Sequence, residues 1–390
     1  MDEQNCHYKT YLSSLLFLFT AALDVLITNK NQRRNRSSSS RSKGSTHIDN
    51  DHCDGKDFDH DDDLLSVVDP QEKLTVTPTT ASEEEFHQVL ALRSNYIPTS
   101  VSLSYANTEP LMMLRGDGVY LYDHTGGAFL DTRNNVAHVG HSNDKVVNAV
   151  VEQLRLLNTN TRYLHPTMAR LAEKLISKMP KGSELCKVFF VNSGSEANDL
   201  ALRLTQCVTK SENMICIAGA YHGHTLSVLN VSPYKFQAGK RPIGQDKNII
   251  MVPAPNASMS ERSILSVKEA VSNFCGGTSG NVGGIIMEGG MSVAGVILPP
   301  KMFYTDAIAR VKEAGGLYIA DEVQTGFGRF GNHYWGFEQN NPGISEGGIN
   351  VFPDIITVGK PFGNGMPLGA VITTERIASV FDDNGVEYFK

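Results

Sequence analysis

Two short apolar segments of the sequence each end close to an ionisable residue. Residues 317–320 read Leu-Tyr-Ile-Ala and precede Asp321, and residues 355–358 read Ile-Ile-Thr-Val and precede Gly359 and Lys360. Apolar runs of this kind predict buried strands, and in an α/β sheet the carboxyl ends of the strands form the ligand-binding edge. We therefore expect Asp321 and Lys360 to lie close together at that edge.

A lysine amine and a carboxylate held at one sheet edge suit pyridoxal 5'-phosphate. The amine can form a Schiff base with the aldehyde of this cofactor, and the carboxylate can keep the pyridine nitrogen protonated so that the ring accepts electrons. A single lysine at a strand end is more often a solvated surface residue. The prediction for Lys360 therefore depends on the other features that the sequence brings to the same edge.

From about residue 86 onward, short aliphatic runs alternate with amphipathic segments. The predicted strands are residues 187–191, 214–218, 284–287, 317–320, 355–358 and 370–373. The predicted helices are residues 143–157, 167–179, 196–208, 261–273 and 304–314. This alternation predicts an α/β fold in which a mostly parallel sheet is flanked by helices. A small hairpin is expected over residues 119–131.

The chain before residue 86 has a different composition. Residues 1–30 are largely hydrophobic, and residues 11–28 are compatible with a membrane anchor, a targeting peptide or an artefact of gene prediction. If they span a bilayer, the basic residues that follow place the rest of the chain on the cytoplasmic side. Residues 31–85 are polar and are expected to be a disordered linker. Beyond them we expect a segment of a small domain (86–140) and a large domain (141–390).

Composition excludes several classes of protein. The 390 residues carry a formal net charge of -7, which gives no general attraction to nucleic acid. The six cysteines are scattered without a C-x-x-C pair, which argues against a disulfide framework and a zinc site, and no metal site is predicted. This cysteine usage favours a reducing compartment, with the cytoplasm as first expectation and mitochondria left open.

Residues 188–198 pass from a strand through a turn of small residues directly into a helix. Backbone N–H groups at a helix start bind anions, and Gly194 would let a phosphate approach them closely, with the Ser195 hydroxyl as a further donor. The same residues also fit an ordinary serine N-cap. Only the expected position of these residues beside Asp321 and Lys360 favours a phosphate site over an ordinary cap.

Five more side chains are expected at the same edge. Tyr221 and His222 follow a predicted strand, where an aromatic ring can stack on a planar cofactor. Glu288 ends another strand. Val323 shares a strand face with the preceding aspartate and could pack under the ring, while Gln324 can donate to the phenolic oxygen. Taken singly, each has an ordinary explanation in core packing or surface exposure.

Four motifs, at residues 192–198, 221–223, 321–329 and 357–360, together resemble the signature of the class-III aminotransferases. These are fold type I enzymes that use pyridoxal phosphate, and the resemblance runs from about residue 90 to the last residue. It implies a fold type I large domain with a partial small domain. It also implies a homodimer whose active site is shared between subunits.

The resemblance assigns a contact with the cofactor to each motif residue. Lys360 is implied to form the covalent bond, Asp321 to contact the pyridine nitrogen and Gln324 to contact the ring oxygen. The other implied contacts are those of Gly194 and Ser195 with the phosphate, and those of Tyr221 and His222 with the face of the ring. Members of the family continue beyond the position of Lys390, so the chain is expected to be C-terminally truncated.

Within the family, residues 134–141 and 156–165 are most similar to phospho-lyases that act on phosphoethanolamine and phosphohydroxylysine. Arg162, in the second of these segments, is a candidate for binding a substrate phosphate because its guanidinium offers a planar fork of donors. One departure is that residues 288–291 read Glu-Gly-Gly-Met, where most of the class has Glu-Pro. The role of Glu288 is carried over with that difference.

Three functional hypotheses follow. The first is a phospho-lyase that binds a primary amine as an external aldimine and releases ammonia, phosphate and an aldehyde. The second is a transaminase that passes the amino group to a keto acid such as pyruvate or glyoxylate. The third is an inactive, truncated remnant that at most binds pyridoxal phosphate.

Overall fold

The computed structural model describes residues 80–383 except residues 160, 236–247, 257, 277–280, 340 and 342–350. The predicted hydrophobic segment at residues 11–28 and most of the predicted linker lie outside the described residues. No helix in the described part of the chain is long and apolar enough to cross a membrane. Helix α2 (Glu83–Tyr96) starts within the last residues assigned to the linker, where the Ser82 hydroxyl accepts a hydrogen bond from the Glu85 amide at 3.2 Å.

The described residues divide into two compact units. One consists of residues 80–133 and 140–143, and the other of residues 134–139 and 144–383. The smaller unit contains α2 and a three-stranded antiparallel sheet of β1 (Met113–Asp117), β2 (Tyr120–Asp123) and β3 (Ala128–Leu130). The predicted hairpin corresponds to β2 and β3, and β1 is the additional strand. The division into domains at the predicted boundaries stays a prediction.

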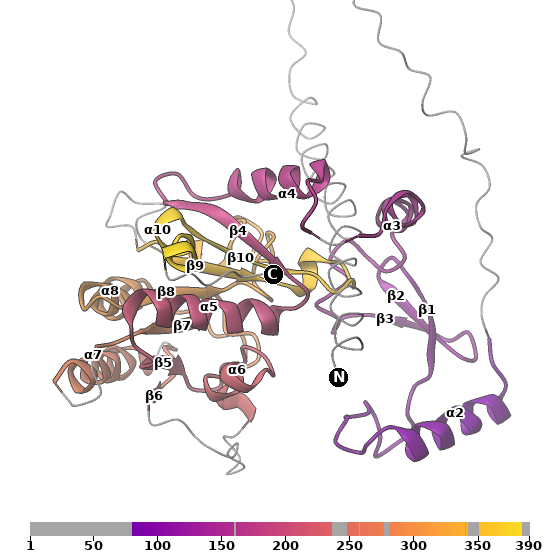
Figure 1. Cartoon of the computed structure of the whole chain (residues 1–390). Coiled ribbons are helices and arrows are strands. Elements are labelled where there is room, and N and C mark those ends of the chain that lie inside the picture. Colours follow the sequence, from indigo (N-terminus) through magenta and orange to yellow (C-terminus); the bar gives the residue numbers. More distant parts are fainter. Residues whose placement is uncertain are drawn as a thin grey trace, which may run out of the picture. The chain divides into compact units, whose positions relative to one another are not determined.

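The larger unit is built on a seven-stranded mixed sheet, with the order β4-β10-β9-β8-β7-β5-β6 (Figure 1). Strand β10 pairs antiparallel with both of its neighbours, and the pairs β9–β8, β8–β7, β7–β5 and β5–β6 are parallel. The fold class is therefore the predicted one. The strands are β4 (Leu185–Val191), β5 (Met214–Ile217), β6 (Ile249–Val252), β7 (Gly284–Glu288), β8 (Leu317–Asp321), β9 (Ile355–Val358) and β10 (Gly369–Thr374).

The same unit contains the helices of the described part of the chain other than α2. They are α3 (Asp144–Leu156), α4 (Pro166–Ile176), α5 (Gly194–Thr209), α6 (Leu226–Asn230), α7 (Ser260–Gly276), α8 (Ala309–Glu313), α10 (Glu375–Ala378) and α11 (Val380–Asp383). Short helical turns are η1 (Pro233–Lys235), η2 (Phe303–Ile308), η3 (Gly336–Glu338) and η4 (Lys360–Phe362). The predicted helix at 304–314 is a π-helical turn, η2, that continues into α8.

Strand β8 illustrates how the sheet is covered on both faces. All five of its residues are buried, as expected of a strand with helices on either side. Leu317 and Ile319 belong to the core cluster that also contains Ala201 and Leu204 of α5. Tyr318, which points to the opposite face, lies beside the fully buried Tyr304 of η2. The buried sheet thus fixes where its strands end, and those ends carry the candidate site.

Candidate active site

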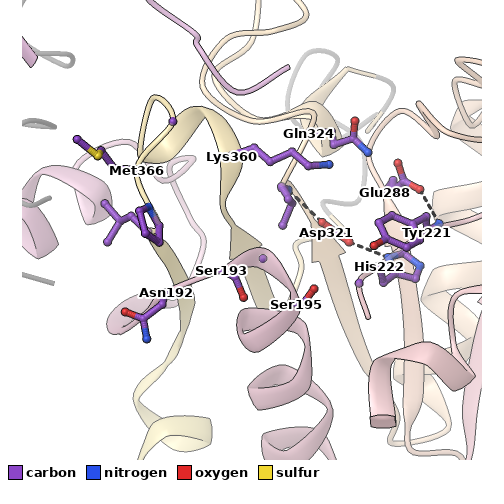
Figure 2. A pocket seen from close by; sticks show the side chains of 16 residues that line it. Asn192, Ser193, Ser195, Tyr221, His222, Glu288, Asp321, Gln324, Lys360 and Met366 are labelled. Carbon is purple, nitrogen blue, oxygen red and sulfur yellow. Dashed lines mark hydrogen bonds and ion pairs between the residues drawn. The ribbon is translucent and has the colours of Figure 1, made fainter. Parts of the chain in front are cut away.

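A cavity of about 400 Å³ lies at the carboxyl ends of the parallel strands (Figure 2). This volume is within the usual range of small-ligand pockets, about 300–1,000 Å³. The residues predicted to bind the cofactor all line it, namely Gly194, Ser195, Tyr221, His222, Glu288, Asp321, Val323, Gln324 and Lys360. The structure therefore brings the predicted constellation together, and the contact of each residue with the cofactor stays a prediction.

Asp321 lies at the end of β8 and is 3% exposed. Its Oδ2 atom accepts a hydrogen bond from Asn198 Nδ2 at 2.9 Å and lies 2.7 Å from His222 Nδ1. Its Oδ1 atom accepts from the Val323 amide at 3.0 Å. These groups hold the carboxylate in one orientation at the base of the pocket. The contact with His222 gives that residue a second task that the sequence did not predict.

Asn198 of α5 holds Asp321 and is itself held by Thr357 of β9, and the sequence had given neither residue a role. Both are fully buried, and the Thr357 hydroxyl donates to Asn198 Oδ1 at 2.6 Å. The amide nitrogen of Asn198 must then face the other way, where it donates to Asp321 and to the His222 carbonyl at 2.6 Å. The sequence offered one signal for these two residues. Each is a polar residue within a predicted helix or strand, at a position that the fold buries.

Lys360 begins η4, two residues after β9 ends. Its φ of +40° lies in the left-handed region that a side chain seldom adopts, and such conformations are often found at functional sites. Figure 2 shows the side chain extended into the pocket toward Asp321, Gln324 and Glu288. Burial lowers the pKa of the Lys360 amine, although the charges of Asp321 and Glu288 act to raise it. Loss of its proton is therefore easier than for a solvated lysine.

The start of α5 is a capped helix whose first residues line the pocket. Ser193 is the N-cap, and its hydroxyl accepts from the Glu196 amide at 3.1 Å. The Glu196 carboxylate turns back to accept from the Asn192 amide at 2.8 Å. The amides of Gly194 and Ser195 belong to the first turn, where helix geometry provides no partner within the helix. The ordinary cap and an anion site are therefore compatible, since they use different groups.

Close packing at this helix start depends on glycine. A Cβ atom added to Gly194 would lie 2.7 Å from Val323 Cγ1, and one added to Gly223 would lie 2.6 Å from Ser195 Oγ. Contacts under 3.0 Å are too short for a side chain to fit without movement of its neighbours. The two glycines therefore allow the helix start, Val323 and the loop after β5 to form a continuous surface of the pocket.

Glu288 ends β7 and is 2% exposed, so it is a buried carboxyl and not a surface one. Its two oxygens accept hydrogen bonds from the Tyr221 amide at 3.3 Å and the Ser292 amide at 3.2 Å. Burial raises the pKa of Glu288 to about 7. The neighbouring His222 acts to lower this pKa, and the charge of Asp321 acts to raise it further. The carboxyl thus fixes the loop that carries Tyr221 and can hold a proton near neutral pH.

The groups in the pocket fit pyridoxal phosphate. A primary amine, a carboxylate, helix-start amides and a carboxamide can match the aldehyde, the ring nitrogen, the phosphate and the phenolic oxygen of this cofactor. The buried Asp321 carboxylate is the strongest indication, because a carboxylate removed from water is stabilised by a positive charge and a protonated pyridine nitrogen supplies one. The cavity is also lined on one side by the apolar side chain of Val323.

Arg162 is placed differently from the other predicted residues. It follows α3 in the chain, and its side chain is exposed. In the described part of the chain it is not among the residues that line the pocket. Its proposed contact with a substrate phosphate stays a prediction.

Glu322 follows directly after β8, next to Asp321, and is not among the described residues that line the pocket. Its carboxyl is fully buried and accepts hydrogen bonds from the Gly336 amide at 2.7 Å, the Phe337 amide at 2.8 Å and the Thr325 hydroxyl at 2.8 Å. Burial outweighs these hydrogen bonds and raises the pKa of Glu322 to about 7.

This raised pKa predicts a pH-dependent stability. Between pH 4.5 and 7 the folded state binds the Glu322 proton more tightly than the unfolded state, so the free energy of unfolding falls as the pH rises. The contribution of this group over that range is about 3 kcal/mol. In Glu322→Gln, urea unfolding at pH 5, 6, 7 and 8 should show a flatter dependence. An unchanged slope would contradict the assignment.

Several known proteins are similar to this chain in sequence. Residues 102–387 match the model of the family described as aminotransferase class-III. The "alanine--glyoxylate aminotransferase 2-like" protein of Drosophila melanogaster is 42% identical over 317 residues, which are 77% of this chain and 61% of that protein. The "ethanolamine-phosphate phospho-lyase homolog 1" of Caenorhabditis elegans is 36% identical over 341 residues, which are 80% of this chain and 69% of that protein.

Among solved structures, a phospholyase from Arthrobacter in complex with phosphoethanolamine superimposes with a TM-score of 0.67 and 34% sequence identity. The match covers 76% of this chain and 68% of that one. The fold and the pocket thus define a pyridoxal-phosphate-dependent protein of fold type I. The chain belongs to the class-III aminotransferase family, whose members use pyridoxal phosphate. It spans 61% of the length of its Drosophila relative.

Two relatives, one from Arabidopsis thaliana and one from Homo sapiens, carry the word mitochondrial in their names. The Homo sapiens protein "alanine--glyoxylate aminotransferase 2, mitochondrial" is 33% identical over 325 residues, which are 75% of this chain and 60% of that protein. The compartment of this chain stays a prediction.

Proposed function

We propose that this chain provides the cofactor-binding domain of an enzyme that acts on a primary amine with pyridoxal phosphate, and that the reaction is that of a phospho-lyase on phosphoethanolamine-like amines. The observation that carries the proposal is the pocket in which Lys360 extends toward the buried Asp321. A lysine with a lowered pKa and a carboxylate fixed by hydrogen bonds are the two groups that chemistry at the carbon beside an amine needs.

Two observations support the phospho-lyase branch. A phospholyase in complex with phosphoethanolamine is among the structural neighbours, at 34% identity. In addition, the segment whose sequence resembles that branch, residues 134–141, includes Asn135, which contacts the pocket residue Gln324. The resemblance to the phospho-lyase branch therefore includes a residue that contacts the pocket lining.

The residues of the pocket have distinct tasks in such a reaction. When bound, pyridoxal phosphate would supply an electron sink for the carbon next to the substrate nitrogen. Asp321 would hold a proton at the ring nitrogen, and the amides of Gly194 and Ser195 would hold the phosphate. Lys360 Nζ would accept the proton from the substrate carbon, since burial lowers the pKa of this amine. Overall, phosphoethanolamine and water would give acetaldehyde, ammonia and phosphate.

The transaminase alternative is favoured by the name of the Drosophila relative, which is 42% identical. The same pocket residues would serve both reactions up to removal of the proton. In a transaminase the amino group is passed to a keto acid, whereas in a phospho-lyase a phosphate on the neighbouring carbon departs. A homodimer with a shared active site is part of the proposal in either case.

An assay with and without a keto acid separates the alternatives. The purified chain is incubated with pyridoxal phosphate and phosphoethanolamine, and phosphate and ammonia are measured. A phospho-lyase should release both in equal amounts without any keto acid. Alanine or glycine formed only when pyruvate or glyoxylate is present, with no phosphate release, would instead support the transaminase. Bound cofactor that absorbs in the visible range without turnover of any amine would support the inactive remnant.

A further inference from the structure

One short segment of the larger unit, residues 134–139, is tied to two loops beside the pocket. Its hydrogen bonds to the loop after β8 run from Asn135 Nδ2 to Gln324 Oε1 at 2.6 Å and between His138 Nε2 and the Phe327 carbonyl at 3.1 Å. The Val139 amide donates to Asn364 Oδ1 at 2.9 Å, in the loop that follows Lys360. Of these contacts, the one with Gln324 ends on a residue that lines the pocket.

The Gln324 carboxamide has two chemically different ends, and its surroundings distinguish them. Its oxygen accepts hydrogen bonds from Asn135 Nδ2 and from the Ser292 hydroxyl at 3.3 Å. Because both donors bind the oxygen, the NH2 group of Gln324 is the end that can donate to a ligand in the pocket. A reversed carboxamide would place its NH2 group against the NH2 group of Asn135 and present an oxygen to the ligand.

Asn135 is itself held by neighbouring groups. Its backbone carbonyl accepts a hydrogen bond from Arg329 Nη2 at 3.3 Å. The preceding side chain, Asn134 Oδ1, accepts from the amides of Val136 and Ala137 at 2.8 and 3.4 Å and so closes a local turn. The Asn135 side chain is therefore presented to Gln324 from a turn that is held by the Asn134 cap and by Arg329, and a positioning group needs such support.

We propose that Asn135 is a positioning residue that fixes the Gln324 carboxamide with its NH2 group toward the pocket, so that the site favours a ligand with an acceptor oxygen beside the aldehyde. The inference rests on the cofactor site of the proposed function and is independent of which reaction follows. Asn135 does not line the pocket in the described part of the chain, so it acts through Gln324.

The test compares two ligands that differ at one atom. Dissociation constants are measured for pyridoxal phosphate and for its 3-deoxy analogue, which lacks the phenolic oxygen, with the wild-type chain and with Asn135→Ala and Asn135→Asp. The wild type should prefer pyridoxal phosphate. In Asn135→Ala this preference should fall by about 3- to 10-fold, which is the contribution of one hydrogen bond.

Asn135→Asp should lower the preference further, because a carboxylate offers only acceptors and would draw the NH2 group of Gln324 away from the pocket. The control is Asn273→Ala, at an exposed asparagine of α7 that is not among the described residues lining the pocket. Thermal unfolding of each variant reports whether the fold is retained. The control should weaken the binding of both ligands equally, or of neither, and should keep the preference for pyridoxal phosphate over the 3-deoxy analogue.

Two outcomes would overturn the proposal. If the Asn135 variants bind both ligands more weakly by the same factor, or keep the wild-type preference, Asn135 has a structural role only and the cofactor site stands. If the wild type binds the two ligands equally, Gln324 does not use its NH2 group in this way. Borohydride trapping of the cofactor on Lys360 tests the proposed function separately, so the two failures are distinguishable.

Discussion

Lys360→Ala is expected to abolish covalent attachment of pyridoxal phosphate and to reduce turnover to background. Burial lowers the pKa of this amine, so a neutral amine is available to bond with the aldehyde and later to accept a proton. Loss of a general base alone costs about 10²- to 10⁴-fold in rate. The measurement is borohydride reduction of the chain with bound cofactor, followed by peptide mapping.

The reduced adduct should map to the peptide that contains Lys360 in the wild type and should be missing in the variant. A matched control is Lys268→Ala, since Lys268 is an exposed lysine on α7. This control should keep both the adduct and the activity. Partial recovery of turnover in Lys360→Ala on addition of a small primary amine would support the role as a base. An adduct on a different lysine would contradict the assignment of the site.

Asp321→Asn is expected to have the second largest effect, through the ring nitrogen of the cofactor. The carboxylate is 3% exposed and is fixed by Asn198, His222 and the Val323 amide. An opposite charge in contact with a titratable group shifts its pKa by about 1–3 units, so removal of the Asp321 charge should make a bound ring nitrogen lose its proton correspondingly more easily. We expect the affinity for pyridoxal phosphate to fall by about 10- to 10³-fold.

The affinity can be compared with that of 1-deaza-pyridoxal phosphate, in which carbon replaces the ring nitrogen. The wild type should bind pyridoxal phosphate more tightly than this analogue, and Asp321→Asn should lose the preference. Asp306→Asn, at an exposed aspartate of η2, serves as the control and should retain it. If Asp321→Asn also retains the preference, the carboxylate does not act on the ring nitrogen.

Much of the sheet could be predicted from the sequence because its strands are continuous apolar runs. The predicted strand at residues 355–358 has the bounds of β9, and the others differ from the structure at their ends by one or two residues. Strand β6 (Ile249–Val252) was not predicted, although it is an apolar run of the same length as β9. A run this short fits a strand or another buried segment, and its pairing with β5 makes it a strand. The antiparallel direction of β10 depends on its two partners, which local sequence does not encode.

The site shows the same division between local and long-range information. The residues expected at strand ends, such as Asp321 and Glu288, do line the pocket because local pattern indicates where a strand stops, and their contacts with the cofactor stay predictions. The interactions of Asn198 with Asp321 and of Asn135 with Gln324 join residues 123 and 189 positions apart. An asparagine has no sequence signal for such a contact, because its hydrogen-bonding groups suit turns, caps and buried networks alike.

The sequence by itself thus determined the fold class, the edge of the sheet that carries the site and the ionisable residues at that edge. These depend on apolar runs, strand ends and glycine-rich turns, which are local properties of the chain. The tertiary structure alone decided how those residues are held: which atoms of Asp321 receive hydrogen bonds, which end of Gln324 faces the pocket, and how burial changes the pKa of Lys360 and Glu288. Such properties depend on groups brought together by folding from distant parts of the sequence, and on the water that folding excludes.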